Sequence, residues 1–335
     1  MIRRPPRSTL SSSSAASDVY KRQPIVKAFH DSSTGTISYV VEDKLTKNCA
    51  VIDSVLDFDL ASGRTSTKNA DEIIDYIRSS KLNIEWIIET HVHADHLSAA
   101  PYIQEKIGGK IGIGEGIMLV QDTFGKIFNA GTEFERDGSQ FDRLFKDNDT
   151  YTIGKLNART MYTPGHTPAC MVHVIEDAAF SGDTLFMPDG GTARADFPGG
   201  DARTLFRSIK KVLNLPGDTR LFICHDYGPG GRDISWETTI SEQRKNNIHV
   251  KDGMTEDKYV EIREARDATL SMPKLIIPAT QVNMRAGDLP DEEENGVGAR
   301  ALPSSSAITH NSNMPKPSPP YSSGIAVPVQ PNSEI

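Results

Sequence analysis

The chain has 335 residues, 37% of them hydrophobic and 24% charged, which is enough for one large domain or two small ones. Its formal net charge of −8 argues against proteins that bind nucleic acid or an anionic membrane surface. No apolar run approaches the roughly 20 residues needed to span a bilayer. Cysteines at only three, widely spaced positions exclude a disulfide framework and favour a reducing compartment, so we expect a cytoplasmic protein.

Both ends of the chain differ from its middle. Residues 1–23 are rich in Arg and Ser, and we expect a disordered leader there. It is either non-native sequence or a transit peptide, and the latter would make the protein mitochondrial. Residues 298–335 are dominated by Pro, Ser and Asn, and cannot bury enough apolar surface to offset the entropy of ordering. We therefore expect one folded catalytic domain at residues 24–297 and a disordered tail after it.

The domain begins with short β-type runs at residues 36–41 and 49–52, followed by a helix at 69–80. Ile73, Ile74 and Ile77 share one face of that helix, behind Ser66 and Thr67 as caps. Residues 84–89 then have the length and β-branched content of a buried strand.

A histidine-rich loop follows this strand directly. Residues 91–96 contain His91, His93, Asp95 and His96, and this spacing cannot place all of them on one face of a regular helix. They can converge if the strand end opens into a tight loop. Imidazole and carboxylate are ligands that suit zinc or iron, and buried charges need partners. The sequence therefore predicts a metal site.

The rest of the domain alternates strands and helices. Ser98 is expected to cap a helix that ends at Gly108, and residues 111–143 form a variable region without an assigned element. Residues 160–163 form a strand, 171–175 and 179–181 a hairpin, and Asp201 caps a helix whose apolar face points to the core. A last strand at 220–224 leads into His225 and Tyr227.

Histidines and aspartates recur where predicted strands end. The residues in this position are His91, His93, Asp95, His96, His166, Asp183 and His225. Loops at strand ends are where α/β scaffolds gather reactive groups. Considered alone, His166 fits a turn histidine as well as it fits a ligand, and Asp183 fits an ordinary turn carboxylate better. Considered together, the set indicates one site. The other histidines (His30, His173, His249 and His310) lack this setting and are expected on the surface or in the core.

With these residues in this order, the chain resembles the metallo-β-lactamase superfamily. Its signature is a His-x-His-x-Asp-His loop followed by a His, an Asp and a last His. The resemblance implies an α/β fold, the four-layer αβ/βα sandwich, with two mixed sheets face to face and a metal cleft along one edge. Because all the ligand positions are filled, the residues alone suggest two metals. A dinuclear zinc site would generate hydroxide for the hydrolysis of an ester, thioester or amide.

A finer resemblance points to another chemistry. Residues 191–197, 201–205, 224–227 and 283–285 look like the persulfide dioxygenase branch, particularly bacterial β-lactamase-hydrolase-like proteins of sulfide oxidation. That branch implies a single Fe(II) per chain, held by His91, His166 and Asp183. Its substrates would be glutathione persulfide and O₂, and its products sulfite and glutathione. Two His and one carboxylate leave three octahedral positions open, as in non-haem Fe(II) oxygenases, whereas zinc has no redox change.

The resemblance also implies roles for the remaining residues. His93, Asp95, His96 and His225 would orient the ligands through hydrogen bonds or hold a second metal. Tyr227 and Asp95 would be catalytic, with Tyr227 donating to a ligand carboxylate or to oxygen, unless it is a core tyrosine.

Glutathione carries two carboxylates, so its site needs cations and amides. Arg194 and Asn283 occupy positions that the family uses around that pocket, and Arg285 is a further candidate. The alternative for Arg194 is that it pairs with Asp196 or a backbone carbonyl. The open alternatives are a glyoxalase-II-type dinuclear zinc thioester hydrolase and a non-catalytic sulfur-sensing or metal-binding protein. We expect no nucleic-acid or membrane partner, and a homodimer is left open.

Overall fold

The computed structural model describes residues 23–131 and 133–290. Apart from Gln23, the predicted leader at 1–23 and the predicted tail at 298–335 lie outside the described residues, as does His310. Within the described part, none of the helices combines the length and apolar character needed to cross a bilayer.

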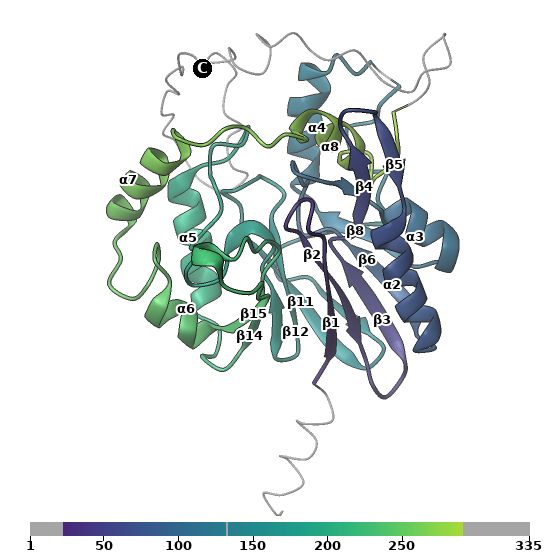
Figure 1. Cartoon of the computed structure of the whole chain (residues 1–335), viewed down its shortest axis with the longest axis horizontal. Coiled ribbons are helices and arrows are strands. Elements are labelled where there is room, and N and C mark those ends of the chain that lie inside the picture. Colours follow the sequence, from purple (N-terminus) through teal and green to yellow (C-terminus); the bar gives the residue numbers. More distant parts are fainter. Residues whose placement is uncertain (1–22, 132, 291–335) are drawn as a thin grey trace, which may run out of the picture.

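Two mixed sheets of six strands each form the centre of the molecule (Figure 1). In the first sheet the order is β1 (Ile25–His30), β2 (Ile37–Glu42), β3 (Asn48–Ile52), β6 (Asn83–Ile88), β8 (Lys110–Gly114) and β9 (Arg143–Phe145). In the second it is β10 (Thr150–Ile153), β11 (Leu156–Tyr162), β12 (Met171–Ile175), β13 (Ala178–Phe180), β14 (Arg220–Phe222) and β15 (Glu237–Thr239). A smaller sheet joins β5 (Arg64–Ser66), β4 (Val55–Asp59) and β7 (Leu97–Ser98).

Helices cover the outer face of each large sheet. The first group is α2 (Lys68–Ser79), α3 (Ala100–Ile107) and α4 (Ile117–Ile127), and the second is α5 (Ala202–Leu213), α6 (Ile240–Asn246) and α7 (Glu256–Asp267). One apolar cluster joins the first group to its sheet, another joins the second group to its sheet, and a third fills the space between the sheets. In Figure 1, α2 and α3 accordingly lie on the opposite side of the sheets from α5, α6 and α7. The predicted four-layer sandwich is confirmed.

The central strands are buried on both faces. In β3, Val51 packs toward the helices, whereas Ala50 and Ile52 pack toward the other sheet. Strands in this position read as continuous apolar runs rather than as alternating ones. Each fully buried aliphatic side chain contributes about 2 kcal/mol of hydrophobic free energy.

The predicted helix starts are confirmed in part. At α2, Thr67 holds the N-cap position, but its hydroxyl donates to the Asp71 carboxylate at 2.8 Å instead of capping the helix, and Ser66 ends β5. Asp201 caps α5, since its carboxylate accepts the N–H of Thr204 at 2.7 Å. At α3 the N-cap position is Ala99 rather than Ser98, although the Ser98 hydroxyl still accepts the N–H of Ala100 at 3.0 Å.

Three elements lie in or at the edges of the region that the sequence left unassigned. They are β8, α4 and β9. Elsewhere in the chain, α8 (Ile276–Asn283) is a helix that was not predicted from the sequence. The spacing of Ile117, Val120 and Phe124 was a readable helical signal, since all three are buried on one face of α4.

His173, on β12, lies in the core between the sheets, where its Nδ1 is 3.0 Å from the Tyr151 hydroxyl. Burial lowers the pKa of His173 to about 4, whereas a histidine in the unfolded chain titrates near 6.5. The stability that the neutral ring contributes is therefore fully present above pH 6.5 and is lost as the pH falls toward 4. Between pH 7 and pH 5 this loss amounts to about 2 kcal/mol. Urea unfolding at both pH values should show a smaller loss in His173→Gln, and equal losses would contradict the assignment.

Candidate metal centre

The strand-end residues predicted from the sequence converge at one place. The ligand atoms of His91, His166 and Asp183 all lie within 4.8 Å of one another, and all three residues are buried. One Asp183 oxygen lies 3.6 Å from His166 Nε2 and 3.9 Å from His91 Nε2. Segments that follow β6, β11 and β13 supply these side chains, so the two sheets together position them.

A second group of ligands adjoins the first through the same aspartate. The other Asp183 oxygen lies 3.4 Å from His225 Nε2, which is also 3.4 Å from Asp95 Oδ2. His93, Asp95 and His96 form a further set with ligand atoms within 4.8 Å of one another. Asp183 therefore faces both groups with one oxygen each.

Buried nitrogen and oxygen atoms without a hydrogen-bond partner among the described residues gather here. They are His91 Nε2, His93 Nδ1, His96 Nε2, Asp183 Oδ1 and His225 Nε2. An unsatisfied buried polar atom costs about 1–3 kcal/mol, so such a group is rare without a function. Imidazole nitrogen and carboxylate oxygen are the donors that iron and zinc take. The residues present therefore fit a bound metal ion.

Hydrogen bonds from the far side orient the imidazoles. His166 donates from Nδ1 to the backbone carbonyl of Arg194 at 2.8 Å, which leaves Nε2 directed at the site. His91 Nδ1 lies 3.0 Å from the Thr90 hydroxyl. Burial lowers the pKa of His91 well below its usual value, and this keeps the ring neutral and able to bind a cation.

His93 is held the other way round, by two buried carboxylates. Its Nε2 lies 3.0 Å from Asp53 and 3.3 Å from Glu89, so Nδ1 is the atom left for the site. Burial opposes the charged ring, but the two carboxylates outweigh it and raise the pKa of His93 well above its usual value. Asp53 also accepts the N–H of Thr90 at 2.7 Å and its hydroxyl at 2.9 Å, which fixes the start of the histidine loop.

Asp53 and Glu89 were not predicted from the sequence as part of the site. Asp53 directly follows β3 and Glu89 directly follows β6. These strands are parallel neighbours in which Ile52 pairs with Ile88, so the two carboxylates lie side by side. The strand-end rule that singled out the histidines would have found both carboxylates once the strand order was known.

The three residues predicted to bind substrate are engaged within the protein. Asn283 donates to the carbonyls of His93 at 2.9 Å and His96 at 2.8 Å, so its amide clamps the histidine loop. Arg194 makes a bidentate pair with Asp196 at 2.5 and 2.7 Å. This is the pairing expected if Arg194 does not bind substrate. Arg285 donates to the Gln281 carbonyl at 2.6 Å. Their contact with substrate remains a prediction.

Tyr227 lies at the mouth of the site rather than in the core. Its side chain is 68% exposed, and its ring is parallel to His225 with the centroids 6.1 Å apart. The core-tyrosine alternative is therefore wrong. Gly35 makes room for this ring, because a Cβ there would lie 2.6 Å from it. Its catalytic role, like that of Asp95, remains a prediction.

Comparison with known proteins identifies relatives over most of the chain. A probable metallo-hydrolase of Burkholderia pseudomallei is 55% identical over 83% of this chain and 98% of its own length. Glyoxylase B2 of Dictyostelium discoideum is 50% identical over 83% of this chain and 96% of its own length. A β-lactamase hydrolase-like protein of Agrobacterium fabrum is 53% identical over 82% of this chain. The chain spans 63% of that relative.

More distant relatives carry another name. The mitochondrial persulfide dioxygenase ETHE1 of Homo sapiens is 28% identical over 75% of this chain and 84% of its own length. The crystal structure of ETHE1 from Myxococcus xanthus superposes with a TM-score of 0.63 and 26% identity, covering 79% of this chain and 100% of that chain. The family model of the metallo-beta-lactamase superfamily matches residues 34–225. With its four-layer fold and its histidine and aspartate cluster, the chain belongs to the metallo-β-lactamase superfamily.

Proposed function

We propose that the protein is a persulfide dioxygenase that oxidises glutathione persulfide with O₂ to sulfite and glutathione. One Fe(II) per chain would be held by His91, His166 and Asp183. The observation that carries the proposal is the buried set of two imidazoles and one carboxylate, whose ligand atoms lie within 4.8 Å of one another. Two histidines and one carboxylate leave room beside the metal for two reactants. Iron, when bound, supplies the redox change that O₂ chemistry needs and that zinc lacks.

In this proposal the chain's own residues hold the ligand set in shape. The Arg194 carbonyl fixes the His166 tautomer, and the Asn283 amide fixes the loop that carries His93 and His96. Such supporting partners commonly change metal affinity or activity by 10- to 100-fold. Tyr227 is exposed, with its ring parallel to that of His225, which supports a role in meeting substrate that enters the site.

A dinuclear zinc thioester hydrolase is the second candidate, and a specific observation favours it. Asp183 presents one oxygen to His166 and the other to His225, at 3.6 and 3.4 Å, as a carboxylate bridging two metals would. Unpartnered atoms on His93 and His96 are further ligands for a second ion. Relatives at 50% identity or more are also named as a metallo-hydrolase and a glyoxylase.

Metal content and substrate consumption separate the two candidates. Protein purified without added metal should carry about one iron per chain, the stoichiometry of a mononuclear oxygenase site. An oxygen electrode should record O₂ uptake with glutathione persulfide, and S-lactoylglutathione should not be hydrolysed. Protein with about two zinc ions per chain that hydrolyses the thioester and consumes no O₂ would establish the hydrolase instead.

A further inference from the structure

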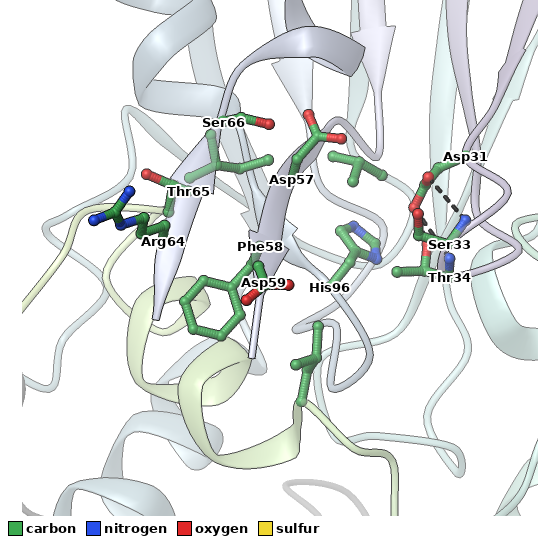
Figure 2. Close-up of a pocket in the computed structure, with 13 residues that line it drawn as sticks. Asp31, Ser33, Thr34, Asp57, Phe58, Asp59, Arg64, Thr65, Ser66 and His96 are labelled. Carbon is green, nitrogen blue, oxygen red and sulfur yellow. Dashed lines mark hydrogen bonds between the residues drawn. The ribbon is translucent and has the colours of Figure 1, made fainter. Parts of the chain in front are cut away.

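A cavity of about 330 Å³ adjoins the metal centre. It lies between the β4–β5 hairpin and the turn after β1, and His96 forms part of its wall (Figure 2). Its size falls within the range of small-molecule sites. Apolar side chains, among them Phe58 and Leu275, contribute to the lining together with hydroxyl and charged groups.

Two of the carboxylates in the lining are already occupied. Asp31 accepts the N–H of Ser33 at 3.0 Å and both the N–H and the hydroxyl of Thr34, at 3.1 and 2.7 Å. Asp57 accepts the backbone N–H of Asn69 at 3.1 Å and its side-chain amide at 2.6 Å. These carboxylates build the walls and are poorly placed to bind a ligand.

Arg64 and Asp59 pair across the hairpin in its antiparallel register and are less engaged than Asp31 and Asp57. The Arg64 side chain is exposed and makes no hydrogen bond or ion pair with any residue in 23–131 or 133–290. Asp59 is also exposed and accepts the N–H of Ser62 within its own turn at 2.6 Å. The cavity lining therefore includes a cation and an anion from cross-strand neighbours, and no ion pair joins them.

We propose that this cavity binds the zwitterionic amino-acid end of a thiol peptide. The α-carboxylate would bind Arg64, the α-ammonium group would bind Asp59, and the sulfur end would extend past His96 to the metal. This inference rests on the proposed function, because glutathione has such an end in its γ-glutamyl residue. A guanidinium forms bidentate pairs with carboxylates, and a neighbouring carboxylate attracts an ammonium group. The apolar side chains of Phe58 and Leu275 then contact the aliphatic part of the peptide.

Binding and kinetics together test the proposal. Calorimetry with S-methylglutathione should show about 10-fold weaker binding in Arg64→Gln, the loss of about 1.4 kcal/mol expected when one charged contact is removed. Arg64→Lys should restore part of the affinity. Acetylation of the ligand's α-amino group should weaken binding to the unmodified protein but have little effect in Asp59→Asn. With glutathione persulfide, Arg64→Gln should raise KM about 10-fold and leave kcat unchanged, since the contact is uniform between ground and transition states.

Two controls make the result specific to the cavity. Arg159→Gln removes another exposed strand arginine, on β11 and outside the cavity lining, and should change nothing. Hydroxyethyl persulfide lacks the amino-acid end, so its KM should be the same in all variants. Unchanged S-methylglutathione affinity in Arg64→Gln, or an equal loss in Arg159→Gln, would overturn the inference. Absence of O₂ uptake in the unmodified protein would instead contradict the proposed function, whereas a selective loss of binding would still support the cavity.

Discussion

Asp183→Ala is expected to lose its metal and to lower O₂ uptake with glutathione persulfide by more than about 100-fold, beyond the effect of a supporting residue. Asp183 is the carboxylate of the proposed ligand set, and it lies within 3.9 Å of His91 and 3.6 Å of His166. Without it, two imidazoles remain, and they supply neither the negative charge nor the third ligand position that iron requires. Iron per chain, measured on purified protein, is the readout that does not depend on turnover.

The matched control for this prediction is Asp218→Ala, which removes an exposed aspartate in a turn before β14. Its iron content and O₂ uptake should equal those of the unmodified protein. If Asp183→Ala kept a full equivalent of iron, the ligand assignment would be wrong even with activity lost. Full activity in His166→Ala would likewise show that the ligand assignment is wrong.

The sequence predicted the metal centre well, for a physical reason. His91, His166, Asp183 and His225 each follow a strand, and strand ends at one edge of a sandwich lie close together whatever the loops between them do. The strands themselves were readable because burial on both faces makes them continuously apolar. The position of the metal centre could therefore be predicted from local sequence patterns and from the order of the strands along the chain.

What the sequence did not predict depends on neighbours that are distant in the chain. Asp53 supports His93 only because β3 and β6 lie side by side, and the strand order has no local signal. Asn283 was predicted to bind substrate, yet its amide bonds the backbone of the histidine loop, about 190 residues earlier in the chain (separations of 190 and 187). Arg64 drew no attention because an exposed arginine in a hairpin has no distinguishing pattern until a cavity is seen beside it.

The largest effect on stability is expected at Asp53, whose side chain is 1% exposed and bonds both Thr90 and His93. Asp53→Ala leaves the His93 Nε2 and the Thr90 N–H buried without these partners, so urea unfolding should show a loss of about 3 kcal/mol. The metal affinity should also fall by about 10- to 100-fold, because only Glu89, at 3.3 Å, is then left to orient His93.

Two further variants separate the lost bonds from other effects of the substitution. Asp53 has a φ of +52°, a conformation that asparagine tolerates better than alanine, so Asp53→Asn retains both the backbone and an acceptor for Thr90. It should lose less stability than Asp53→Ala, and a larger loss would mean that charge rather than hydrogen bonding dominates. Asp57→Ala removes a less buried aspartate with bonds to Asn69 alone, and should cost about 1 kcal/mol. Equal losses of unfolding free energy in Asp53→Ala and Asp57→Ala, or unchanged metal affinity in Asp53→Ala, would show that the buried carboxylate does not support the site. Glu89 would then be the carboxylate that orients His93.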